Sequence, residues 1–305
     1  MPKKVLVLYY TQTGQLYDIV SSVITSLKAG GDVEIFLEEL KPDPPFPFPW
    51  SSSAFFQAFP ESVKGIPCLL KPTKIPPEKS FDLIIIAYQP WYLSPSVPFH
   101  AFFQQESTRH MISGKPVITL IGCRNMWVMA QETIKQYIKE ANGNLVGNIV
   151  LRDRAPNLLS VVTIIRWMMK NKKERYLKIF PPAGVSKSDI LDAQRFGTII
   201  RHFLLHGQFD QLQSELVHAG AVEVQPELVL LEKRGKMLFR LWAEFILKKG
   251  SYGSPSRHFR LVLFKYYLLT VLYLVSPFAT LLFYLTKPFR KKSIQNQILY
   301  YQELN

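Results

Sequence analysis

The sequence contains few cysteines and no regular histidine pattern, and both absences exclude classes of protein. Cys68 and Cys123 are the two cysteines among 305 residues, so a framework of several disulfides is excluded. The six histidines are scattered without the spacing of a zinc site, and no metal centre is predicted. The apolar run Val5–Leu8 is too short for the hydrophobic region of a signal peptide. These observations predict a cytoplasmic chain with reduced thiols.

Acidic residues are scarce in the second half of the chain. Residues 1–150 carry 13 basic and 12 acidic side chains, whereas residues 151–305 carry 24 basic and 11 acidic ones. Nearly all of the formal net charge of +14 therefore belongs to the second half, which predicts two regions with different partners. A hydrophobic content of 48% excludes a disordered chain and provides material for a large core.

The first half alternates short apolar runs with segments of helical periodicity. Gly14–Leu27 has apolar residues at helical spacing, and Phe81–Ala87 is apolar almost throughout, as a parallel strand buried on both faces requires. The other strands are expected at residues 3–9, 33–37, 117–121 and 145–151, and the other helices at residues 97–111 and 126–142. This order predicts an α/β fold with a doubly wound, five-stranded parallel sheet in residues 1–152. Its ligand is expected beyond the carboxyl ends of the strands, where the winding reverses.

The loop between the first strand and the first helix is a candidate phosphate site. Neither a Walker lysine motif nor G-x-G-x-x-G is present, so the usual nucleoside triphosphate and dinucleotide sites are not indicated. The loop offers hydroxyls at Thr11 and Thr13, close backbone approach at Gly14, and the N–H groups of a helix N-terminus. With Gln12 and Gln15, this string resembles the FMN phosphate loop of the flavodoxin-like family. Gln15 replaces a common threonine, and its amide can also donate to phosphate.

Two later loops extend the resemblance to a flavin ring site. Flavodoxin-like proteins cover the two sides of the ring with the loops that follow the third and fourth strands. The residues implied here are Gln89, Pro90, Trp91 and Tyr92 in the first loop, and Gly122, Cys123, Arg124, Asn125 and Trp127 in the second. Core packing is the alternative for the aromatic residues and the simpler role for Cys123. Arg124 either stabilises reduced anionic flavin or is a solvated arginine.

A proline-rich insertion, residues 41–79, stands where this fold usually has a crossover helix. It contains the aromatic strings Pro45–Trp50 and Phe55–Glu61. Two interpretations stay open, because such a segment either forms the wall of an apolar pocket above the flavin or is a rigid surface loop.

Several segments along the whole chain are shared with one narrower family. They are Lys3–Gln15, Pro45–Trp50, Tyr88–Ser96 and Phe180–Gly184. Together they resemble the bacterial dialkylresorcinol condensing enzymes. The resemblance implies an FMN-dependent aromatase that oxidises a 2,5-dialkylcyclohexane-1,3-dione to a 2,5-dialkylresorcinol in the biosynthesis of lipids and aryl-polyene pigments. It also implies a ketosynthase-like partner, which joins and cyclises the two acyl chains.

An oxidation of this kind needs a group that accepts a proton from the ring. The candidates near the flavin loops are His100, Tyr88 and Tyr92, and His100 is favoured because its pKa is accessible. A structural role is the alternative for His100. Two other functions stay open: an NAD(P)H-dependent quinone reductase or quinone-linked oxidase on a membrane surface, and a tethered electron carrier of the flavodoxin type.

An apolar segment near the C-terminus predicts contact with a membrane surface. Residues 153–305 are expected to be mostly helical, and Tyr266–Leu285 is a run of 20 residues without a charge. Basic residues flank both ends, and Pro277 interrupts the run. We therefore expect an apolar hairpin at residues 259–286 that lies in the cytoplasmic membrane interface and meets anionic lipids, with a buried hairpin as the alternative. Nucleic acid is not an expected partner, because the basic residues form no polar stripe.

Overall fold

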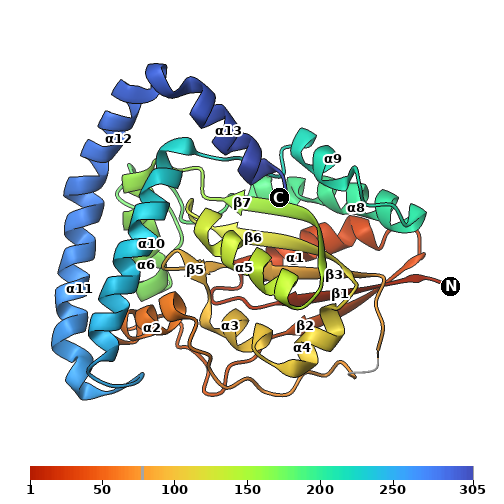
Figure 1. The fold of residues 1–305 in the computed structure, drawn as a ribbon, viewed down its shortest axis with the longest axis horizontal. Helices are drawn as coiled ribbons and strands as arrows, with labels where there is room; N and C mark the ends of the chain where they lie inside the picture. The colour runs from red at the N-terminus through yellow and green to blue at the C-terminus, as the bar shows by residue number, and fades with distance from the viewer. Residues whose placement is uncertain (77–78, 305) are drawn as a thin grey trace.

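The central sheet has five parallel strands in the order β2-β1-β3-β6-β7, which is the order of a doubly wound flavodoxin-like fold. The computed structural model describes residues 1–76 and 79–304 (Figure 1). The strands are β1 (Lys3–Tyr9), β2 (Val33–Glu39), β3 (Leu83–Tyr88), β6 (Pro116–Cys123) and β7 (Asn144–Arg152). Each expected strand is confirmed to within two residues at either end. A short antiparallel hairpin, β4 (Pro90–Trp91) with β5 (Ser94–Pro95), follows β3.

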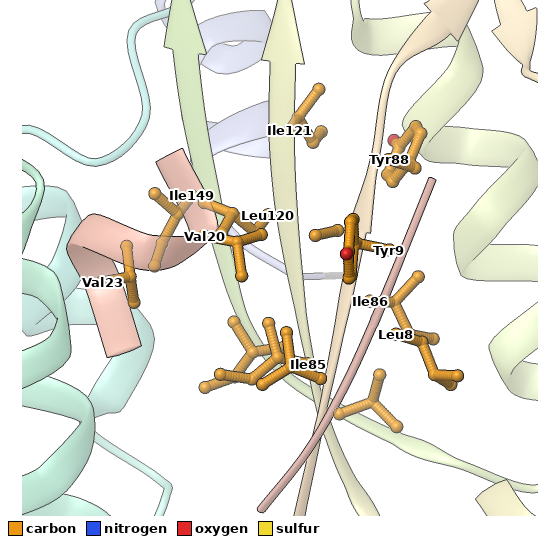
Figure 2. Close-up of a cluster of buried hydrophobic side chains, with 14 of the residues drawn as sticks. Leu8, Tyr9, Val20, Val23, Ile85, Ile86, Tyr88, Leu120, Ile121 and Ile149 are labelled. Atoms are coloured by element: carbon orange, nitrogen blue, oxygen red, sulfur yellow. The ribbon is translucent and has the colours of Figure 1, made fainter. Parts of the chain in front are cut away.

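The core lies on both faces of the sheet. Every residue of the central strand β3 is buried, as its continuous apolar sequence requires. On one face, Val20 and Val23 of α1 (Gln15–Leu27) lie close to Leu120 and Ile149 of the sheet (Figure 2). The apolar residues of α1 recur at helical spacing, so one side of this helix is buried and the other is exposed.

The helices on the first half differ from expectation in two places. The helix expected at residues 97–111 is two helices, α3 (Val97–Phe103) and α4 (Glu106–Ile112). The proline-rich insertion contains a helix of its own, α2 (Ser52–Lys64), whose N-cap Ser51 accepts a hydrogen bond from the N–H of Ala54. Residues 77–78 of the insertion lie outside the described residues. The helix expected at residues 126–142 is α5 (Val128–Glu140).

The second half of the chain is helical and begins by packing on the sheet domain. Its first helices are α6 (Asn157–Lys170), α7 (Lys187–Asp192), α8 (Gln194–His206), α9 (Leu212–His218) and α10 (Pro226–Leu247). Helix α8 packs closely on α1, because a Cβ atom on Gly197 would lie 2.0 Å from the backbone oxygen of Val23. Along the edge strand β7, the N–H of Asn148 donates to the Gln213 side chain and the N–H of Val150 to the backbone of Ala221. The β7 edge of the sheet is therefore covered.

The hairpin expected at residues 259–286 does not form. Helix α11 (His258–Thr270) continues through a π-helical segment, Val271–Val275, into α12 (Ser276–Thr286), and the chain reverses only after a 3-10 turn, η3 (Lys287–Arg290). The last helix, α13 (Lys291–Gln302), then returns to the body of the molecule (Figure 1). Pro277 does not end the helix, because it lies in the first turn after the wider π segment, where its missing N–H costs little.

Candidate functional site

A cavity of about 270 Å³ lies at the carboxyl ends of β1, β3 and β6. This is the position at which ligands bind in doubly wound sheets. The walls are mostly apolar and come from the three predicted loops, the insertion and the second half of the chain. The lining residues are Gln12, Thr13, Gln15, Leu16, Ile19, Trp50, Phe55, Ala58, Gln89, Pro90, Trp91, Tyr92, Gly122, Cys123, Arg124, Ile164, Ile165, Trp167, Met168, Met169 and Gly184.

The first loop has the geometry of an anion site. Gly14 is the N-cap of α1 with a left-handed φ of 84°, and it offers no side chain to the N–H groups of the first helical turn. The hydroxyl oxygen of Thr11 is buried without a hydrogen-bond partner among the described residues. Thr13 lines the cavity, and its hydroxyl accepts a long 3.5 Å bond from the N–H of Gln15. Thr11, Thr13 and Gly14 can therefore hold a phosphate at this helix terminus.

The two glutamines of this loop fix its position and do not offer free amides. The Gln15 side chain donates to the backbone oxygen of Val185 at 2.9 Å and accepts from its N–H at 3.0 Å. Gln12 accepts from the Tyr10 hydroxyl and donates to the oxygen of Pro47 at 2.8 Å. The side chain of Gln15 is thus not available to a phosphate, and the glutamine at this position instead joins the loop to the second half of the chain.

The second loop reaches the cavity through a strained hairpin. Gln89 lines the cavity, and its side-chain nitrogen is buried without a partner among the described residues. Tyr92 and Leu93 form the turn between β4 and β5, with φ values of 50° and 61°. This region is costly for residues other than glycine and is found mainly where function or packing imposes it. The Tyr92 hydroxyl donates to the backbone oxygen of Phe55 at 2.6 Å, which ties the hairpin to α2.

The insertion forms an aromatic wall of the cavity, which agrees with the pocket-wall interpretation and not with a surface loop. The Trp50 ring lies 5.5 Å from the Trp91 ring and 5.9 Å from the Phe55 ring, centroid to centroid. Phe46 packs edge-on against Trp91 at 5.1 Å. The backbone N–H of Trp50 donates to the oxygen of Met168, so the insertion also contacts the second half of the chain.

Some residues of the third loop line the cavity and others pack in the core. Gly122 and Cys123 line the cavity, and a Cβ atom on Gly122 would lie 3.1 Å from the terminal methyl groups of Leu16 and Ile19 of α1, which is a tight contact. Trp127 is 2% exposed and packs in the core at the start of α5, so it is not brought to the cavity as expected. Burial raises the pKa of the Cys123 thiol, which keeps it protonated and favours a packing role.

Arg124 is the charged side chain among the residues that line the cavity. Its guanidinium donates to the oxygen of Asn157, the side chain of Asn157 and the hydroxyl of Ser160, all at the start of α6. Burial lowers the pKa of Arg124 to about 10, so it still carries its charge at neutral pH. Asn125 lies beside it and donates to the Asn157 side chain, while its own oxygen is buried without a partner among the described residues. Arg124 is therefore not the solvated arginine of the alternative interpretation.

The far wall of the cavity comes from segments that the sequence does not connect with the site. Helix α6 contributes Ile164, Ile165, Trp167, Met168 and Met169, and Gly184 lies beside them. At Gly184, φ is 80° and an added Cβ atom would lie 2.7 Å from the Trp167 ring, so only glycine fits. The strongly apolar sequence of α6 and the segment that ends in Gly184 are signals of an apolar surface, but neither identifies the cavity as its partner.

Two of the three candidate bases lie away from the cavity. The Tyr88 hydroxyl is buried and donates to the Gln131 side chain at 2.8 Å, and burial raises the pKa of Tyr88 well above its usual value. His100 is 2% exposed, and its ring nitrogens lie 2.8 Å from the Tyr137 hydroxyl and from the Ser62 oxygen. Neither residue lines the cavity, because the packing of α3 under α2 turns His100 into the protein interior. Tyr92 alone among the three lines it.

Replacing His100 by Gln is expected to change stability and not ligand binding. The Ser62 oxygen requires an Nε2–H donor, so Nδ1 accepts from Tyr137 and the ring is neutral. Burial lowers the pKa of His100 from 6.5 to about 4, so below pH 6.5 the unfolded state takes up a proton that the folded state does not, and the unmodified protein loses stability as the pH falls between these values. At neutral pH the variant should lose about 1–3 kcal/mol in urea unfolding. The difference in unfolding free energy between the variant and the unmodified protein should shrink in acid, because the variant has no imidazole to protonate.

The outcome of this substitution separates a structural histidine from a catalytic one. Flavin affinity and the rate of any flavin-dependent reaction should match those of the unmodified protein. A variant with normal stability and a large loss of rate would show that His100 reaches the ligand after all.

The unpaired polar atoms around the cavity fit FMN. Buried polar side-chain atoms nearly always have a partner, so several orphans around one cavity indicate a polar ligand. Gln89 Nε2 and Trp50 Nε1 belong to residues that line the cavity, whereas Thr11 Oγ1 and Asn125 Oδ1 lie in the first and third loops outside the lining. The other unpaired atoms among the described residues lie elsewhere, on Ser94, Ser96, Arg152, Gln225 and Arg257. The atoms of the first group include donors and acceptors, which a flavin ring can pair with at its polar edge. The helix N-terminus at Gly14 supplies the site for a terminal phosphate.

Comparison with solved structures finds chains that are similar to part of this one. No family model and no curated protein matches the chain. A flavoprotein in complex with FMN from Lactobacillus acidophilus NCFM is 15% identical, covers 48% of this chain and 93% of its own, and has a TM-score of 0.40. A flavodoxin from the domain Archaea is 12% identical over 67% of this chain and 99% of its own, with a TM-score of 0.37. A WrbA-like flavodoxin from Agrobacterium tumefaciens is 11% identical over 68% and 99%, with a TM-score of 0.36.

Proposed function

We propose that this chain is an FMN-dependent oxidoreductase that aromatises a 2,5-dialkylcyclohexane-1,3-dione to a 2,5-dialkylresorcinol. The observation that carries the proposal is the composition of the cavity at the carboxyl ends of the strands. A phosphate-type loop borders it on one side, and on the other side apolar and aromatic walls from α6 and the insertion enclose the space. Such a cavity suits a flavin together with an apolar ring substrate.

The loops would divide the binding of FMN between them. Thr11, Thr13 and the N-terminus of α1 would hold the phosphate, and the unpaired amide of Gln89 would pair with the ring. Trp91 would pack against the ring, because its own ring is held between Trp50 and Phe46. FMN, when bound, would supply the two-electron acceptor that this oxidation needs.

The remaining cavity residues would bind the substrate and handle its charge. The alkyl groups would lie against Ile164, Ile165 and Met168, since these side chains exclude water. A 1,3-dione is acidic and would lose one ring proton to water, so that it binds as the enolate, and loss of a hydride from the enolate followed by tautomerisation gives the resorcinol. The cationic Arg124 would stabilise that enolate. Burial raises the pKa of Tyr92, and its hydroxyl proton is already donated to the Phe55 oxygen, so Tyr92 would line the pocket with its ring and would not act as the base.

The two other functions raised by the sequence remain alternatives to be distinguished. An electron carrier must expose its flavin edge to a partner protein, whereas here Trp50 and α6 add apolar walls that would suit a substrate beside the flavin. A quinone reductase would use the same site with NAD(P)H as the reductant. The ketosynthase-like partner stays a prediction from the resemblance.

The deciding experiment is anaerobic mixing of the purified flavoprotein with a 2,5-dialkylcyclohexane-1,3-dione. We expect the visible flavin absorbance to disappear without NAD(P)H, because the substrate itself provides the hydride. One equivalent of resorcinol per flavin should appear by mass spectrometry. Bleaching by NAD(P)H alone, with no resorcinol formed, would instead identify a reductase.

A further inference from the structure

The outer side of α11–α12 is an exposed apolar stripe. Its members are spaced four, seven or eight residues apart, which are whole turns of the helix, and Phe278 and Leu282 are 72% and 61% exposed. The stripe includes Phe259, Tyr266, Leu274, Phe278, Leu282 and Phe289. At 1.5 Å per residue this helix is about 40 Å long. The stripe is therefore a continuous apolar surface, unlike the single apolar residues that are scattered over ordinary protein surfaces. An apolar face of this size indicates a partner.

The charged residues of the segment that carries the stripe are all basic. From Phe245 to Gln302 the chain has nine lysines and arginines and no aspartate or glutamate. Lys248 and Lys249 are exposed beside the start of α11, and Arg290, Lys291 and Lys292 are exposed at the far end. An apolar strip between two cationic clusters matches the layered chemistry of an anionic bilayer surface, with acyl chains below phosphate headgroups.

Both ends of this segment are held on the same body of the protein. At the start of α11, Arg257 pairs with Glu61, and the Phe264 ring stacks on the Phe59 ring at 3.6 Å. At the other end, α13 returns to the body, where Tyr301 is buried and the Gln302 oxygen accepts from Gln213. The stretch Pro255–Gln302 is long and apolar enough to cross a membrane by composition alone. Because both ends of this stretch are attached to the same body of the protein, the stretch can lie in the membrane interface without crossing the membrane.

We propose that α11–α12 docks on the surface of an anionic phospholipid bilayer as a monotopic anchor. The apolar stripe enters the acyl boundary, and the cationic clusters contact lipid phosphates. This proposal stands independently of the flavin chemistry. A second copy of the chain is a poorer occupant, because pairing two stripes in either direction brings cationic clusters together, with no carboxylate between Phe245 and Gln302 to neutralise them.

The helix also connects the docking surface to the cavity through α2. Phe59 and Glu61 of α2 contact Phe264 and Arg257, while Phe55 and Ala58 of the same helix line the cavity. Helix α2 therefore lies between α11 and the cavity. This arrangement suits a substrate with two alkyl chains, which partitions into lipid.

Flotation of the full chain with lipid vesicles tests the proposal. Vesicles of phosphatidylcholine with one third phosphatidylglycerol should carry the protein, and vesicles of phosphatidylcholine alone should bind it at least about tenfold more weakly. Phe278→Asp with Leu282→Asp should reduce binding to the anionic vesicles by more than about a hundredfold. Removing the charges of Arg290, Lys291 and Lys292 with glutamine should reduce it about 10- to 100-fold and weaken the preference for anionic lipid, of which Lys248 and Lys249 should keep a part.

The matched control is Leu191→Asp, since Leu191 is 65% exposed on α7, away from this stripe. That variant should bind vesicles like the unmodified protein, and all variants should unfold at similar urea concentrations. Absence of vesicle binding by the unmodified, folded protein would overturn the proposal. A dimer that Phe278→Asp with Leu282→Asp dissociates, in a protein that does not float with vesicles, would overturn it in favour of self-association.

Discussion

Replacing Thr13 by Ala together with Gly14 by Val is expected to abolish retention of FMN. The first change removes a hydroxyl from the cavity lining, and a hydrogen bond to a charged group contributes about 1.5–3 kcal/mol. The second puts a β-branched residue at a φ of 84°, where strain of about 1–3 kcal/mol would shift the loop and the first turn of α1. Together they should weaken FMN binding by more than about a hundredfold, measured by flavin fluorescence on titration of the apoprotein.

Gly31→Val is the matched control for this pair of changes. Gly31 has a φ of 77° and, like Gly14, has no neighbouring atom within 4 Å of an added Cβ. It lies near the other end of α1, after its C-terminus, so the same backbone strain occurs far from the cavity. This variant should be destabilised and still yellow. Flavin retained by Thr13→Ala with Gly14→Val would show that the phosphate lies elsewhere.

The sheet is predictable from the sequence because its signals are local. A strand buried on both faces must be apolar along its length, and Leu83–Ala87 has that sequence and that burial. The three loops follow directly from the strands, since the carboxyl ends of parallel strands share one edge of the sheet. For this reason the sequence alone indicates that Thr13, Gln89 and Gly122 belong to one site, and all three line the cavity.

The remaining parts of the site depend on contacts between distant segments. No local pattern indicates that α6 lines the cavity at the carboxyl ends of the strands, because its apolar residues would suit any core. The environment of His100 is set by Ser62 and Tyr137, which lie 38 and 37 residues away in the sequence. Pro277 predicts a break in the helix. The helix nevertheless continues, because Pro277 directly follows a π-helical segment whose wider turn accommodates a residue without an N–H. Tertiary context decides each of these features.

Loss of either partner of the Arg257–Glu61 pair is expected to be strongly destabilising. The Arg257 side chain is fully buried, and its two terminal nitrogens lie 2.7 and 3.1 Å from the two Glu61 carboxylate oxygens. Arg257→Met leaves a buried carboxylate without its cation, and Glu61→Gln leaves a buried cation without its anion. Each variant should lose about 3–5 kcal/mol of unfolding free energy, measured by urea titration.

Restoring neutrality should recover most of that loss, because the cost comes from the unpaired charge and not from the absence of the pair. The double variant Glu61→Leu with Arg257→Met buries two apolar side chains instead and should be more stable than either single variant. The surface pair of Lys64 with Glu244, 2.9 Å apart between α2 and α10, is the matched control. Glu244→Gln should leave unfolding unchanged, because solvent screens that pair. Since Arg257 joins α11 to the helix that lines the cavity, a double variant as unstable as the single ones would show that this pair has a structural role beyond charge neutralisation.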